Sequence, residues 1–503
     1  MNKRRLGIAV FSMLAAFTMI TTGYGCHSSS HHDDPTSDIS TDITGTPTVA
    51  PTTAAPGVED IGDVVENKEV YNPTSQVNIE NTYTYFVQGF TVGDTGLDSS
   101  IVKYKLMRYD AGMACETGKA IEPEEVEISL TGSGELQLQN PYHVAGYVDN
   151  KSNDDPSDDV LYLAITDLGT NKAVYLLDFG QRDMNDAKTH WKPEAKAINL
   201  LTCNTGLATQ QPLTCTFDNK NVFWTDYTDE GKVLYCSFTD TVAKKEAEYC
   251  GIAVQGLSYP AVVTTTGGPF GAVSCQSDNR VALFKINVND TDIAQTYPLD
   301  FRKPKECNYI TPEDRYNSYL NPYDLKWISY GEGDNIQYYL LITSGLALNP
   351  YGRSASPADR SALWIYKNTA KGEGETGLSN ISNDHYKMLV DQLNYTVSPF
   401  LSEVPTGYAT RSYICYTSTG DPINPDNKDT RGSLNRVVYD FAKDAVVKNS
   451  DEQLLGDIED PFGAIAFLGQ EREFTIYTTH WNWKDASKNS SIKAIVNGPL
   501  PKD

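Results

Sequence analysis

Residues 221–235 read NVFWTDYTDEGKVLY. Two apolar runs, rich in aromatic and β-branched residues, flank a polar turn that contains a glycine, which is the pattern of a β-hairpin. The second run continues to Phe238 and is apolar on both faces of the predicted strand. Strands of this kind are buried between neighbouring sheets.

The same pattern recurs along the chain, and long amphipathic helical patterns are nearly absent. We predict seven hairpins, whose first strands begin 51 to 77 residues apart. They pair residues 83–90 with 101–109, 160–166 with 173–179, 221–226 with 232–238, 272–276 with 280–288, 337–344 with 361–367, 411–418 with 434–441, and 473–483 with 491–497. This spacing is typical of propeller blades with long loops.

We therefore predict an all-β chain with a single β-propeller, of seven blades in the first place and of six or eight as neighbouring solutions. Radially arranged blades leave only short strand edges exposed, so one domain of more than 400 residues is reasonable. Residues 221–235 also resemble a YWTD-type propeller repeat, which implies the same fold. The alternative is two β-sandwiches in series, although no Pro/Gly-rich break marks a boundary between them.

The first 25 residues have the composition of a signal peptide. A basic start, Lys3-Arg4-Arg5, precedes the uncharged run Leu6 to Ile20, which is shorter than the ~20 apolar residues of a transmembrane helix. The following residues, Gly23-Tyr24-Gly25-Cys26, resemble a bacterial lipobox. The resemblance implies a lipid on Cys26 that holds the protein at the membrane. Because His27 rather than Asp follows the cysteine, it also implies an outer-membrane lipoprotein of the cell envelope; the alternative is a secreted protein.

Residues 26–75 are expected to form a disordered tether and residues 76–503 the propeller domain. From His27 to Val70 there is no aromatic residue, and Ser, Thr, Pro and Asp predominate. Such a segment cannot bury enough apolar surface to offset the entropy lost on ordering.

The chain is acidic, with 66 Asp and Glu against 41 Lys and Arg and a net charge of -25. Loss of the three basic residues of the signal segment makes the charge three units more negative. Since binding to phosphates requires a basic surface, this composition excludes nucleic acid as a partner.

Eight cysteines follow Cys26, and an even number in an exported chain indicates up to four disulfides, with buried free thiols as the alternative. They are Cys115, Cys203, Cys215, Cys236, Cys250, Cys275, Cys307 and Cys415.

The sequence contains no serine-hydrolase elbow, P-loop or His-Glu-x-x-His motif, and we assign no catalytic residue, cofactor or metal site. Calcium is a candidate cation, because the acidic segments 154–159 and 424–429 offer several oxygen ligands. Solvated acidic turns are the simpler interpretation of both segments.

The loops of the last three hairpins are long and would emerge on one face of a propeller. They combine aromatic rings, which stack on apolar surfaces, with side chains that bind hydroxyl or carboxylate groups. The candidate ligand-binding residues are Tyr351, Arg353, Arg360, Asp426, Arg431, His480, Trp481 and Trp483. Alternatively, Trp481 and Trp483 close the last blade against the first.

These features together predict an exported, lipid-anchored and non-catalytic binding module for a glycan or a peptide. One alternative is a carbohydrate-active hydrolase with two carboxylates in the central pocket, for which Asp226, Asp229, Asp324 and Asp440 lie in or near predicted hairpins. The other is an assembly scaffold at the outer membrane.

Overall fold

The computed structural model describes part of the chain, and all structural statements concern that part. The described residues are 57–66, 70–89, 104–130, 133–151, 155–170, 172–184, 191–200, 211–226, 232–238, 248–249, 257–265, 268–275, 280–285, 307–310, 322–331, 336–344, 361–368, 386–393, 401–405, 410–420, 431–448, 450–459, 461–469, 472–479 and 490–498.

The described residues form seven sheets, which are antiparallel except for one strand pair in blade 2. We number the sheets as blades in chain order and name the strands of each blade from the centre outwards. Blade 1 contains β2 (Ser75–Ile79), β3 (Tyr83–Gln88), β4 (Lys105–Asp110) and β5 (Glu124–Glu125). Blade 2 contains β8 (Pro141–Asp149), β9 (Val160–Asp167), β10 (Ala173–Gln181) and β11 (Glu194–Asn199), extended by β6 (Glu127–Leu130), which runs parallel to β11, and β7 (Ser133–Glu135). Blade 3 contains β12 (Pro212–Asp218), β13 (Asn221–Asp226), β14 (Lys232–Ser237) and β15 (Glu248–Tyr249).

Blade 4 contains β16 (Leu257–Thr265), β17 (Gly268–Cys275), β18 (Arg280–Lys285) and β19 (Cys307–Ile310). Blade 5 contains β20 (Pro322–Tyr330), β21 (Gln337–Ser344), β22 (Ser361–Asn368) and β23 (Tyr386–Leu393). Blade 6 contains β24 (Leu401–Pro405), β25 (Arg411–Gly420) and β26 (Arg431–Asp440), with β27 (Ala445–Val446) and β28 (Glu452–Ile458) both paired to β26. Blade 7 contains β29 (Phe462–Leu468), β30 (Glu473–Thr479), β31 (Ser491–Val496) and, from the start of the chain, β1 (Glu59–Asp63). The helical elements are α2 (Ala111–Thr117) and the short η2 (Pro156–Asp158).

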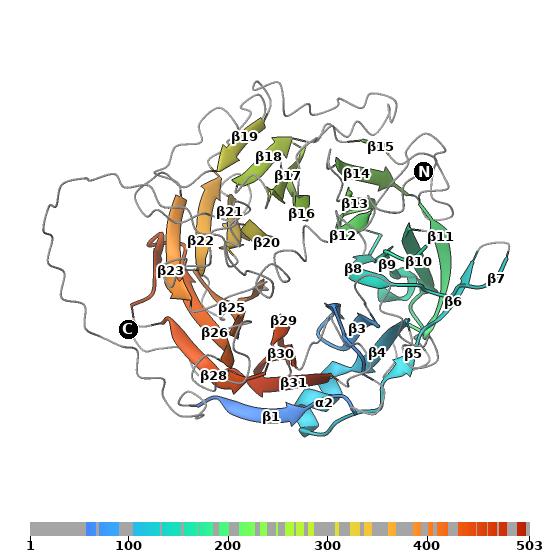
Figure 1. Cartoon of the computed structure of the whole chain (residues 1–503), viewed down its shortest axis with the longest axis horizontal. Coiled ribbons are helices and arrows are strands. Elements are labelled where there is room, and N and C mark those ends of the chain that lie inside the picture. Colours follow the sequence, from blue (N-terminus) through green and yellow to red (C-terminus); the bar gives the residue numbers. More distant parts are fainter. Residues whose placement is uncertain are drawn as a thin grey trace, which may run out of the picture.

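The innermost strands of successive blades contact each other, and β2 of blade 1 contacts β29 of blade 7, so the sheets close into a ring (Figure 1). The predicted all-β propeller is confirmed, with the blade number that was expected first. Each predicted hairpin is the pair of second and third strands of one blade, such as β13 with β14. No described helix is long and apolar enough to cross a membrane.

Strand β1 closes the ring because it forms the outer edge of a blade whose other strands come from the end of the chain. It pairs antiparallel with β31, Glu59 lying opposite Val496 (Figure 1). The propeller therefore begins at Glu59, and the boundary expected between residues 75 and 76 is wrong. The sequence EDIGD has no apolar pattern that would predict a strand, because its residues are half-buried or exposed at a sheet edge.

The core consists of apolar layers between neighbouring blades. One layer joins Tyr162 and Ala164 of β9 to Trp224 of β13 and Leu234 of β14. Both faces of these strands are covered, as the apolar runs predicted. Burial of a side chain as large as Leu234 stabilises the fold by about 1.5–3 kcal/mol.

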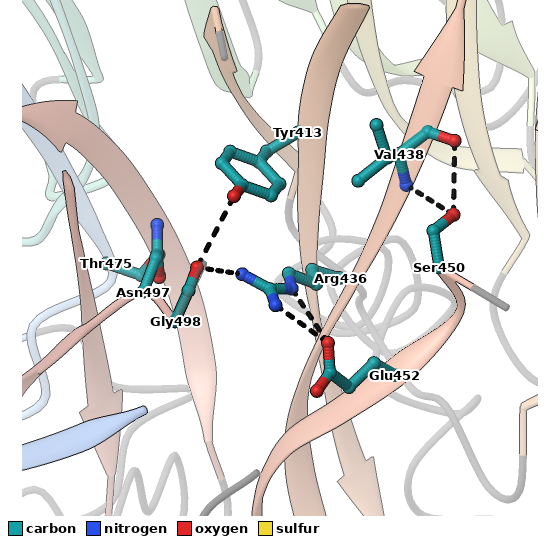
Figure 2. A network of polar contacts seen from close by, with 8 residues as sticks. All are labelled: Tyr413, Arg436, Val438, Ser450, Glu452, Thr475, Asn497 and Gly498. Atoms are coloured by element: carbon teal, nitrogen blue, oxygen red, sulfur yellow. Dashed lines mark hydrogen bonds and ion pairs between the residues drawn. The ribbon is translucent and has the colours of Figure 1, made fainter. Parts of the chain in front are cut away.

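Two buried arginines on third strands connect their blades to the next blade. In Figure 2, Arg436 of β26 pairs with Glu452 at 2.8 Å and donates from Nη1 to the carbonyl of Gly498, which follows β31, at 2.7 Å. Arg108 of β4 pairs with Glu124 and donates to the carbonyl of Trp191 in blade 2. Each guanidinium also lies over a tyrosine ring of the neighbouring strand.

In three blades, the side chain of the last residue of the second strand binds the segment that precedes the innermost strand. This side chain accepts a backbone N–H of that segment. The acceptor and donor pairs are Gln88 with Tyr71 (3.4 Å), Asp167 with Asn140 (2.7 Å) and Asp226 with Gln211 (2.6 Å). In the YWTD-like segment, Asp226 therefore has a structural role.

The cysteines whose side chains are described are buried free thiols, namely Cys115, Cys215, Cys236 and Cys415. For these four the expectation of disulfides is wrong, because each occupies an apolar layer or strand face within a blade. Burial raises the pKa of the Cys115 thiol to about 12 and that of Cys415 to about 11, which keeps both protonated.

Candidate ligand-binding site

One face of the ring carries the connections between second and third strands, and the innermost strands begin at the same face. Pro141, the first residue of β8, lies opposite Asp167, the last residue of β9, which in turn pairs with Ala173, the first residue of β10. Pro212 of β12 is placed in the same way against Asp226. We call this the loop face; it is the common face that the hairpin pattern predicted.

Most of the predicted ligand-binding residues lie outside the described residues. They are Tyr351, Arg353, Arg360, Asp426, His480, Trp481 and Trp483. Arg431 is the first residue of β26 and pairs with Gly420, which places its backbone at the loop face. The described residues do not include Cys26 either, so the lipid anchor remains a prediction.

A cavity of about 500 Å³ occupies the centre of the ring. Residues of six innermost strands line it, and its walls combine backbone with mostly small or neutral side chains. A site in this position is built from segments far apart in the sequence, as is usual for propellers and other folds whose strands converge on one axis.

His143 and Cys215 form a contact between blades 2 and 3 on the wall of this cavity. The Cys215 N–H donates to Nδ1 of His143 at 3.3 Å, and its Sγ lies 3.5 Å from the same nitrogen. Burial lowers the pKa of His143 to about 4 and raises the pKa of the Cys215 thiol. The pair is therefore neutral at pH 7, with the imidazole proton on Nε2, and it lacks the thiolate that a cysteine nucleophile requires.

Two carboxylates are found among the described lining residues, Glu80 and Asp324. Glu80 forms an ion pair with Arg182 at 2.7 Å, and Asp324 accepts the N–H of Leu325 at 2.9 Å. Of the other carboxylates considered for a hydrolase, Asp226 and Asp440 are engaged by backbone N–H groups, and Asp229 lies outside the described residues.

Described His, Cys, Asp and Glu residues form no group of three that would hold a metal ion. In the first acidic segment, Asp155 accepts the N–H of Ser157 at the start of η2, and Asp159 pairs with Arg182. Residues 424–429 lie outside the described part, so calcium binding there is still only an expectation.

The sequence alone does not point to the lining residues of the cavity, apart from Asp324. Each of the six lining strands contributes between one and five residues, and strands such as SQVNI of β2 have no apolar run. These strands could have been predicted from their position, because an innermost strand must precede each predicted hairpin by a few residues.

The fold and its cavity define a β-propeller with a central cavity. No family model matches this chain, and no curated protein matches it. Among solved structures, it is similar to a periplasmic gluconolactonase of Pseudomonas aeruginosa, with 8% identity over 81% of this chain and 98% of that chain and a TM-score of 0.43.

It is also similar to hydrazine synthase of Kuenenia stuttgartiensis, with 9% identity, 84% and 96% of the two chains covered and a TM-score of 0.42. A putative 6-phosphogluconolactonase of Bacteroides uniformis shares 12% identity over 76% of this chain and 86% of that chain, with a TM-score of 0.42. At such scores the similarities carry no argument about the activity of this protein.

Proposed function

We propose that this protein is an exported, lipid-anchored and non-catalytic binding module that recognises a glycan or a peptide at the loop face of its propeller. The central cavity carries this proposal, since it extends along the innermost strands and includes residues at their starts, on the face where the hairpin loops also begin. Small-ligand sites are usually concave and combine apolar walls with a few well-placed polar groups. This cavity combines apolar residues such as Phe217 and Leu325 with polar ones such as Thr74 and Gln76.

The state of the described ionisable groups favours binding over hydrolysis. A glycosidase places two carboxyl groups about 5 to 10 Å apart around the scissile bond. Of the two described lining carboxylates, Glu80 already has Arg182 as its partner. His143 and Cys215 are held neutral.

The proposed anchor fits the position of β1. Cys26 and Glu59 are 33 residues apart, so the connecting chain has a maximal reach of about 110 Å. A tether of this length allows the propeller to search a layer above the membrane.

A screen of the full-length chain against glycan and peptide arrays tests the proposal, with products analysed for every ligand that binds. Binding without turnover is the expected result. Turnover would establish a hydrolase instead, and the absence of any ligand would favour an assembly scaffold.

A further inference from the structure

The junction between blades 1 and 7 has a polar wall toward the cavity. On β2 the side chains alternate between two faces. Ser75 faces blade 2, because its hydroxyl donates to the carbonyl of Val144. Thr74 and Gln76 therefore face blade 7, and both line the cavity.

Blade 7 presents Thr478 to the same space. Along β30, Phe474 and Ile476 pack in an apolar cluster with Phe86 of blade 1, and Phe86 is the cross-strand partner of Gln76. Thr478 continues the same face of β30 and also lines the cavity. The apolar contact between the two blades thus becomes polar at the loop face.

The polar atoms of these three side chains are buried and have no partner among the described residues. They are Oγ1 of Thr74, Oγ1 of Thr478, and both Nε2 and Oε1 of Gln76. Thr74 is only 4% exposed and Thr478 only 2%. Buried polar groups are nearly always hydrogen-bonded, so a cluster of four such atoms on a cavity wall indicates a missing partner.

A comparison between blades supports this interpretation. Thr478 pairs with Phe462, the first residue of β29, as Asp167 pairs with Pro141 and Asp226 with Pro212. Both aspartates use their side chains to hold backbone N–H groups. In blade 7 the neighbouring Thr479 instead donates to the carbonyl of Glu459, and the Thr478 hydroxyl is left to face the cavity.

The backbone opposite Thr478 also leaves space. The pairing of β29 with β30 is irregular between Phe462 and Ala464, and the intervening Gly463 has φ +79° with no atom within 4 Å of the position of an added Cβ. Gly463 is itself part of the cavity wall.

We propose that Thr74, Gln76 and Thr478 bind one face of an uncharged sugar ring in the central cavity. This inference rests on the proposed function and narrows its ligand. Hydroxyls and a carboxamide both donate and accept hydrogen bonds, which matches the hydroxyls of a sugar. None of the three side chains carries a charge that would neutralise a charged ligand.

Calorimetric titration of the full-length chain with neutral sugars tests the assignment. The probes are glucose, galactose, mannose and N-acetylglucosamine, with glucuronate and glucose 6-phosphate as charged counterparts. We expect at least one neutral sugar to bind more tightly than its charged counterpart. Loss of one hydrogen bond in Thr478→Val should weaken binding about 5- to 10-fold, and Thr74→Val should act similarly.

Thr475→Val is the matched control, because Thr475 is equally buried on β30 but donates to Oδ1 of Asn497 at 2.8 Å. The control should lower the melting temperature and preserve the affinity. Thr478→Val should preserve or raise the melting temperature and lose affinity, since it removes a hydroxyl without a protein partner.

Other results would overturn the inference. If Thr478→Val and Thr74→Val raise the melting temperature and leave affinity unchanged, the hydroxyls hold only water. If the arrays yield a peptide ligand insensitive to both variants, the proposed function survives and the sugar site does not. If no ligand of either class binds, both fail.

Discussion

At the scale of single residues, buried arginines such as Arg436 join the blades. The Arg436 side chain is 1% exposed, and its guanidinium binds both Glu452 and the Gly498 carbonyl (Figure 2). Removing one partner of a buried ion pair leaves the other uncompensated, so Arg436→Ala should destabilise the protein by about 3–5 kcal/mol.

The control for this prediction is Arg472→Ala, since Arg472 is 37% exposed and pairs with the exposed Glu59 at 3.1 Å. Its loss should cost less than about 1 kcal/mol. Urea unfolding of both variants is the measurement, and equal effects would show that Arg436 does not join blades 6 and 7 as described.

A second residue-scale prediction concerns pH. Burial raises the pKa of Glu473 from 4.5 to about 7, although nearby Arg436 acts in the opposite direction. The folded state therefore binds a proton that the unfolded chain releases between these values. The protonated Glu473 therefore stabilises the folded state fully below pH 4.5, and this stabilisation is lost as the pH rises through 7.

Glu473→Gln removes this titration. The melting temperature of the variant relative to the parent should rise by roughly 1–2 °C between pH 5 and pH 8. Calorimetric scans across this range are the measurement; a difference that does not change with pH would show that Glu473 titrates normally.

The lipid anchor depends on one residue as well. If Cys26 is acylated, Cys26→Ser should move the protein from the membrane to the soluble fraction on fractionation of the producing cells. Unchanged association with the membrane would mean that the lipobox resemblance is misleading.

At the scale of elements, β1 is expected to hold the ring closed. Deleting Glu59–Asp63 removes the partner of β31 and exposes the edge of blade 7. We expect a lower melting temperature and aggregation through the free edge. Deleting five residues at 46–50 of the expected tether is the length-matched control, and an equal effect of the two deletions would argue against closure by β1.

The sequence predicts the second and third strands of every blade because these strands are covered on both faces and consist of apolar runs. It does not predict innermost strands such as β2, whose burial pattern includes half-buried polar residues beside the cavity. Outer strands such as β5 and β15 have only two residues and no pattern to detect.

The Thr-Asp pair of the YWTD-like segment shows how local sequence and structure relate. The YWTD resemblance covers one hairpin of the sequence, whereas the structure places Thr166-Asp167 of β9 in the same role as Thr225-Asp226 of β13. Thr hydroxyls accept the N–H of the third residue in the innermost strand, where the pairing is irregular, in both blades. The flanking apolar residues differ because packing requires only suitable volume.

At the scale of the whole molecule, the ring brings residues separated by about 400 positions, such as Thr74 and Thr478, to one cavity. The sequence points to a ligand site in the late loops, because long loops with aromatic residues form a local pattern. The cavity has no such pattern, since its polar groups occur singly on different strands. Only the closed ring brings these groups together around one cavity.

The central claim is that the protein binds its ligand at the loop face of the central cavity, and hydrogen exchange of the full-length chain with and without the strongest array ligand tests it most directly. We predict slower exchange in the innermost strands β2, β8 and β29, with unchanged exchange in the outer strands β5 and β15. Protection confined to outer strands, or no protection at all, would contradict a site in the centre of the propeller.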